Sequence, residues 1–290
     1  MKRLIALAAT LAALTTACAE SGAQPLGPAP GNGSESPSSA GSPTTSPSTS
    51  PDPTRSMTYE LWFNYDGSLF VTHRTEPFTP AVGRRALEAL LDGPTDSERD
   101  ARVVTSINPG TRLLDLTIDN GVATVDLDAT FSAEETPAIA VGSLSQIVYT
   151  LTQFDSVDGV VFEVEGTPLP NFGGYELDGA QSRANFADQL PFILVQSPGI
   201  GERVSSPVTI AGTSDVFEAV VSIEILDRNG DIVASTFTMA TCGTGCRGSY
   251  TTDVRYDVET RQPGTIRAYE VSAMDGSPIH IVEIPVMLTP

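Results

Sequence analysis

The pattern of apolar residues changes once along this chain, near Leu190. Before that point, strand-like and helix-like stretches alternate, whereas after it only short strands separated by turn residues recur. Apolar residues at every second position line one face of a strand, and a spacing of three and four lines one face of a helix. We therefore expect an α+β domain over residues 57–189 and an all-β sandwich over residues 190–290.

The α+β region contains turn and cap signals in a regular order. They predict a hairpin around Asp66-Gly67, a helix from Thr79-Pro80 to Gly93-Pro94, a hairpin around Asn120-Gly121, a second helix and a strand at residues 159–164. The second helix begins either after Ser132, where Glu135 would complete a capping box, or at Thr136-Pro137. We expect two helices on a small mixed sheet, with residues 167–188 connecting the domains.

The second region has no helical period. Turn signals recur roughly every 8–12 residues, which predicts an immunoglobulin-like sandwich of about seven strands. The last strand contains Pro285, and proline cannot donate a ladder hydrogen bond, so this strand is expected at an edge.

The first residues predict export. Lys2 and Arg3 precede a short apolar run that ends at Ala17-Cys18, which is typical of a signal peptide over residues 1–17. The run is too short to span a bilayer as a helix. The cysteine looks like that of a bacterial lipobox, in which it carries the lipid. That motif usually has leucine three residues before the cysteine, where this chain has Thr15, so an ordinary secretory signal cleaved near Ala17 is the alternative.

Residues 18–56 are rich in Ser, Pro and Thr and cannot bury a core, so we expect a lipid anchor followed by a disordered stalk. These features place the chain on the outer face of the cell membrane, held only by the lipid. The formal charge of −20 disfavours nucleic acid as a partner.

Two cysteines remain after Cys18. Cys242 and Cys246 are separated by Gly-Thr-Gly, and in an exported chain an even remainder predicts a disulfide. No histidine lies near them to complete a zinc site. We therefore expect a local disulfide at the tip of a hairpin, and we expect no metal site at these cysteines.

The residue inventory gives little support for catalysis. The only lysine is Lys2, and the two histidines, His73 and His280, fall in different predicted domains. No Gly-x-Ser-x-Gly turn is present, so we expect neither an enzyme nor a cofactor. Trp62, the only tryptophan, can stack on a sugar if it faces solvent; the alternative is that it packs beneath a helix.

Three stretches of the first domain carry a family resemblance. They are Ala86 to Pro94 with Glu98, Asn108 to Leu114 with Gly121 to Leu127, and Gln146 to Phe154. In this order and spacing they resemble a GerMN (sporulation and spore germination) domain. That resemblance implies a small α/β unit, similar to ring-building motifs, that takes part in assembling envelope complexes.

The second domain resembles the immunoglobulin-like Gmad domain of bacterial spore-germination proteins. The resemblance rests on Ser197-Pro198, Gly201, Val204, Ser206-Pro-Val208, Gly212, Phe217-Glu-Ala219, Asp227 to Gly230, Ser272 to Ser277 and Ile284-Pro-Val286. The pair implies non-catalytic extracytoplasmic modules. We expect an adaptor or scaffold lipoprotein that contacts an unidentified envelope or membrane protein; the alternative is a module that binds peptidoglycan or wall polysaccharide.

Overall fold

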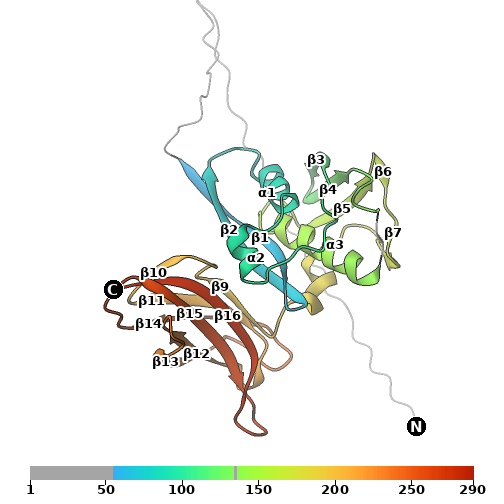
Figure 1. Ribbon diagram of the computed structural model, residues 1–290. Helices are drawn as coiled ribbons and strands as arrows, with labels where there is room; N and C mark the ends of the chain where they lie inside the picture. Colours follow the sequence, from blue (N-terminus) through green and yellow to red (C-terminus); the bar gives the residue numbers. More distant parts are fainter. Residues whose placement is uncertain (1–54, 134–135) are drawn as a thin grey trace, which may run out of the picture. The chain divides into compact units, whose positions relative to one another are not determined.

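A computed structural model describes residues 55–133 and 136–290 (Figure 1). Cys18, the expected signal peptide and nearly all of the expected stalk lie outside the described residues, as does Glu135 of the expected capping box. Within the described ranges, no helix is long and apolar enough to cross a membrane.

The α+β domain combines a two-stranded ribbon, a four-stranded mixed sheet and two main helices. In chain order its elements are β1 (Ser56–Tyr65), β2 (Ser68–Pro77), α1 (Val82–Leu91), α2 (Asp96–Asp100), β3 (Leu113–Asp119), β4 (Val122–Leu127), α3 (Pro137–Leu151), β5 (Gly159–Val164), β6 (Thr167–Pro168), β7 (Asn171–Phe172), β8 (Tyr175–Glu176) and the 3-10 helix η1 (Arg183–Gln189). The ribbon is β1-β2, the mixed sheet has the order β3-β4-β5-β6, and β7-β8 form a small hairpin. Both predicted hairpins are present, and β4 pairs parallel to β5.

The helices begin where their caps can be satisfied. α3 begins at Pro137, and the Thr136 hydroxyl accepts a hydrogen bond from Ile139 N–H at 3.3 Å, which is the second of the two predicted starts. α1 begins two residues later than its signal predicts, because Thr79 Oγ1 bonds the backbone of Ala81 outside the helix. The short helix α2 was not predicted.

Strand β1 pairs with β2 along one edge, and α3 covers the other edge. Gln146 Nε2 donates to the Trp62 carbonyl at 3.1 Å, and Thr150 Oγ1 accepts from the Trp62 N–H at 3.1 Å. Gln153 bonds both backbone groups of Glu60, at 2.7 and 2.8 Å. Side chains spaced four and three residues apart on one helix face thus replace a neighbouring strand.

This arrangement satisfies groups that would otherwise be costly to bury. Gln146 and Thr150 are fully buried, and Gln146 also accepts from the Ser106 N–H at 2.8 Å. An unpaired backbone N–H or C=O in the interior would cost free energy comparable to a lost hydrogen bond. The polar residues in the middle of α3 are therefore part of the core.

Residues 167–188 are not a simple connection between domains, as the sequence suggested, but part of the α+β core. β6 pairs with β5, and Gln181 forms an isolated bridge with Val160. Phe172 and Phe186 are buried, and the Phe172 ring stacks on Phe131 with centroids 4.8 Å apart. These aromatic contacts fix the segment against the domain.

The second domain is a sandwich of eight strands, close to the predicted number. Its elements are β9 (Ile193–Ser197), β10 (Arg203–Ser205), β11 (Val208–Ser214), the 3-10 helix η2 (Phe217–Ala219), β12 (Val220–Leu226), β13 (Ile232–Met239), β14 (Gly248–Val254), β15 (Gln262–Val271) and β16 (Pro278–Thr289). One sheet has the order β10-β16-β15-β12-β13 and the other β14-β11-β9. Val221, Ile223 and Ile225 alternate into the core between them.

The edge position predicted for the last strand is wrong. β16 lies between β15 and β10, but β10 pairs only with residues 287–289. Pro285 therefore lies beyond the end of that ladder, where no neighbouring strand requires its missing N–H; its carbonyl accepts from Gly201 N–H at 2.8 Å. The proline marks the end of a ladder within the sheet and not the edge of the sheet.

Because α3 side chains bond the free edge of β1, removing the amide of Gln146 should lower the stability of the α+β domain strongly. Gln146→Ala leaves the Trp62 carbonyl and the Ser106 N–H unpaired, and we expect the free energy of unfolding of the α+β domain to fall by about 3 kcal/mol. Because Trp62 is the only tryptophan, its fluorescence during denaturant titration reports on this domain alone. Gln189→Ala, which removes an amide with no hydrogen bond recorded among the described residues, is the control; equal losses for both variants would contradict the assignment.

Candidate functional site

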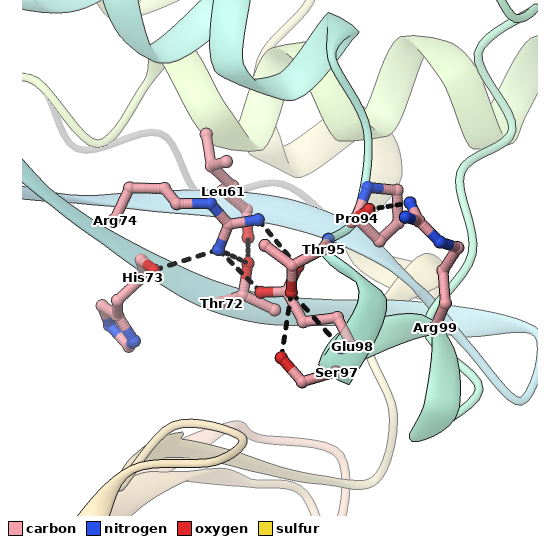
Figure 2. Close-up of polar contacts among 9 residues, drawn as sticks. All are labelled: Leu61, Thr72, His73, Arg74, Pro94, Thr95, Ser97, Glu98 and Arg99. Carbon is pink, nitrogen blue, oxygen red and sulfur yellow. Dashed lines mark hydrogen bonds and ion pairs between the residues drawn. The ribbon is translucent and has the colours of Figure 1, made fainter.

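A paired arginine and glutamate hold the start of α2 against strand β2 (Figure 2). Arg74 on β2 donates through both terminal nitrogens to the two carboxylate oxygens of Glu98, each at 2.7 Å. The Glu98 side chain is only 6% exposed. Two parallel charge-assisted bonds fix both orientation and distance, so this pair positions α2.

Glu98 also caps the helix in which it lies. Its carboxylate accepts from Thr95 N–H at 2.7 Å, while Thr95 Oγ1 accepts from Glu98 N–H at 3.3 Å, which completes a capping box. Burial raises the pKa of Glu98, but the bonds to Arg74 and to the Thr95 N–H lower it by more than burial raises it. The pKa of Glu98 therefore lies below its ordinary value of 4.5. The carboxylate is therefore charged at neutral pH and serves the structure.

The segment held in this way forms one wall of a pocket of about 320 Å³. Gly93-Pro94 and Pro109-Gly110 line it together with the buried side chains of Val103 and Ile107. Val104 at the rim is 56% exposed. The turn after the first helix and the Asn108-Pro-Gly turn, which are far apart in sequence, thus meet around one apolar hollow.

Two neighbouring exposed apolar side chains lie on the outer face of the five-stranded sheet. Phe237 and Met239 on β13 are 66% and 64% exposed. Phe237 lies opposite Ser222, and Met239 lies opposite Val220, so both side chains share the face away from the buried row of β12. Contiguous exposed apolar surface is typical of protein-binding sites.

Trp62 does not serve as a ligand contact in this structure. It is 1% exposed, its ring lies 4.8 Å from that of Tyr149 on α3, and its Nε1 donates to Glu60 at 3.0 Å. Arg183 covers the cluster, with its guanidinium 4.8 Å from the Tyr149 ring centre. The geometry corresponds to packing beneath a helix, the alternative that the sequence allowed.

The other predicted residues occupy ordinary structural positions. Cys242 and Cys246 form a disulfide with Cα atoms 5.6 Å apart. His73 lies on β2, and His280 on β16 bonds the Glu270 carboxylate at 2.8 Å. Across residues 55–133 and 136–290, no group of three or more His, Cys, Asp or Glu side chains is arranged to hold a metal ion. The lipidation expected at Cys18 lies outside the described residues.

The exposed row on β13 was missed from the sequence. Alternation alone does not say which of two faces is buried when both carry apolar residues. One signal was available: Ile232–Met239 contains no charged residue, in a chain of which 18% of residues are charged.

Comparisons with known families match both domains. The family described as "Sporulation and spore germination" (Germane) matches residues 62–170, and the "Immunoglobulin-like domain of bacterial spore germination" (Gmad2) matches residues 192–277. The gap between the two matches, residues 171–191, contains most of the core segment at residues 167–188. No curated protein matches the chain.

Several solved structures are similar at low identity. The first GerMN domain of the sporulation protein GerM from Bacillus subtilis is 22% identical, with 44% of this chain and 98% of that chain covered and a TM-score of 0.40. The tandem GerMN domains of the same protein are 14% identical, with 80% and 60% covered and a TM-score of 0.39. A putative lipoprotein from Clostridium perfringens is 16% identical, with 47% and 93% covered and a TM-score of 0.34.

The Arg74–Glu98 pair predicts acid sensitivity. Because the folded-state pKa of Glu98 is lowered, its contribution to stability is full above the ordinary value of 4.5 and is lost as the pH falls through the folded value. We expect Glu98→Gln to cost about 3 kcal/mol at neutral pH and to flatten the acid limb of the stability curve, measured by Trp62 fluorescence. Asp96→Asn, which changes a 95% exposed carboxylate, is the control and should behave like the wild type. An unchanged acid limb in Glu98→Gln would contradict this role.

The disulfide closes a very short loop, so its effect should be small and local. Replacing both cysteines with serine (Cys242→Ser with Cys246→Ser) should lower the free energy of unfolding of the sandwich by about 2 kcal/mol and leave the α+β domain unchanged. Calorimetry and Trp62 fluorescence together separate the two domains. If the unfolding transition monitored by Trp62 is lost, the disulfide also stabilises the α+β domain, which the short loop does not predict.

Proposed function

We propose that this chain, which contains a sporulation and spore germination domain followed by an immunoglobulin-like domain of bacterial spore germination, is a non-catalytic adaptor that binds another protein of the bacterial envelope. The observation that carries this proposal is the exposed apolar row on β13, with Phe237 and Met239 both more than 60% exposed. Isolated exposed apolar residues are common on any protein, but adjacent ones on an uncharged strand fit a partner surface.

The proposal includes a location. The signal-like residues 1–17 and Cys18 support a lipid anchor on the outer face of the membrane, and the Ser/Pro/Thr-rich residues 18–56 support a tether between that anchor and the folded domains. In this arrangement the α+β domain follows the tether and the sandwich is the distal domain along the chain. A tethered pair of domains then meets its partner close to the membrane, at a raised effective concentration.

The anchor is tested by a single substitution. We expect Cys18→Ala to move the protein from the membrane fraction to the soluble exported fraction, because the thiol that carries the lipid is removed. Cell fractionation with immunoblotting measures the change, and Cys242→Ser with Cys246→Ser is the matched control that leaves Cys18 in place. Membrane retention of Cys18→Ala would rule out anchoring by this residue.

Adaptor function predicts a protein partner and no affinity for the wall itself. Cross-linking in intact cells, followed by purification of the full chain, should recover one protein repeatedly. The purified chain should stay in the supernatant when it is mixed with sacculi stripped of protein. Strong pelleting with such sacculi would replace the adaptor proposal with binding to peptidoglycan.

A further inference from the structure

Strand β13 ends the five-stranded sheet, and its own sequence lacks the residues that usually protect an edge; β14 of the other sheet lies beside its C-terminal end, where the Thr241 N–H donates to the Ser249 carbonyl at 2.9 Å. Natural edge strands are commonly short or carry charged residues or proline, which prevent uncontrolled pairing. β10 has three residues and includes Arg203, β14 contains Asp253, and β3 contains Asp115 and Asp119. β13 has eight residues, none charged and none proline.

The hydrogen-bond pattern shows which backbone groups of β13 are free. Ala240 N–H donates to the Ala219 carbonyl at 2.8 Å, which fixes the alternation of the β12–β13 ladder. The N–H and C=O groups of Ser235, Phe237 and Met239 therefore point away from β12. Outside the β12–β13 ladder, no backbone hydrogen bond among the described residues involves these groups. We refer to these three residues and their free backbone groups as the β13 edge.

The side chains at this edge suit a strand that is added to it. Phe237 and Met239 project from the outer face beside the free groups, so an added strand would bury them with its own alternate side chains. Adding a strand supplies main-chain hydrogen bonds for affinity and side-chain contacts for specificity. The β13 edge and the exposed side chains of Phe237 and Met239 thus belong to one surface.

Charge indicates the kind of segment that fits. Asp231 immediately precedes β13, and Glu218 lies beside its end, where Ala219 bonds Ala240. Neither carboxylate forms an ion pair within the described residues, and the chain carries a formal charge of −20. A second copy would bring equal charge to the same surface, whereas a segment with basic ends would be attracted.

We infer that the β13 edge binds an extended segment of a partner protein, apolar at alternate positions and flanked by lysine or arginine, by adding it to the sheet as a further strand. The inference rests on the proposed adaptor function and names its binding surface. It differs from docking on the outer face alone, because the main-chain groups of Ser235, Phe237 and Met239 take part.

The test uses two synthetic peptides of alternating threonine and valine, one with arginines at both ends and one with glutamates. The full chain carrying Cys18→Ala is titrated with each peptide, and amide hydrogen exchange is followed by NMR. With the arginine-ended peptide at about ten times its Kd, exchange at Ser235, Phe237 and Met239 should slow about ten-fold, and the glutamate-ended peptide should give no protection. Protection elsewhere, equal protection by both peptides, or no protection by either would overturn the inference.

A matched pair of variants distinguishes binding through the main-chain groups of the β13 edge from binding to the outer face of the sheet alone. Ser235→Pro removes one outward N–H without touching a ladder bond and should weaken binding about ten-fold, whereas Ser235→Ala retains the N–H and should bind like the wild type. Phe237→Thr, which keeps a strand-forming residue, should also weaken binding and guards against misfolding of the proline variant.

The same variants distinguish this inference from the adaptor proposal. If cross-linking recovers the same partner from wild type and Ser235→Pro, the edge is not the binding surface although the adaptor function stands. If the chain alone sediments as a dimer and Ser235→Pro is a monomer, the occupant is a second copy, which overturns the basic partner segment.

Discussion

The α+β domain depends on helix α3 supplying to strand β1 the hydrogen bonds that a neighbouring strand would otherwise supply. Gln146, Thr150 and Gln153 meet the backbone of Trp62 and Glu60. This requires the helix to lie with its polar stripe inward, against the usual orientation of amphipathic helices. The remaining faces of α3 are covered in turn, because Tyr149 packs on Trp62 and Arg183 donates to the Tyr149 carbonyl at 3.0 Å. The segment at residues 167–188 thereby becomes part of the core.

The two domains treat exposed strand edges in opposite ways. In the α+β domain the free edge of β1 is closed by side chains from the same chain, and in the sandwich the edge of β13 is left open beside exposed apolar residues. An open edge is a liability for aggregation unless it is occupied or kept apart by charge. The strong negative charge of the chain limits pairing between copies while leaving the edge accessible to a segment of opposite charge.

Much of the architecture could be predicted from local signals, because turns and caps are encoded by adjacent residues. Asp66-Gly67, Asn120-Gly121 and Thr136-Pro137 each adopt the predicted turn or cap. The failures involve contacts between distant residues. Pro285 predicted an edge strand because the residues around it do not reveal that β10 is short and pairs only with residues 287–289. Trp62 remained ambiguous because Tyr149, against which it packs, lies 87 residues away in a separate element. The β13 edge was missed for the same reason, since the face that a strand buries is decided by its neighbours.

The separation between β1 and α3 has a consequence for how the domain folds. Glu60 and Gln153 bond across 93 residues, so the ribbon β1-β2 is made long before the helix that completes it. Contacts of such long range slow folding, and at roughly 5–20 residues per second a chain under synthesis exposes the unfinished edge for several seconds. The ribbon β1-β2 therefore keeps an unsatisfied backbone edge until α3 has been made, and the α+β domain is most open to mispairing during that interval.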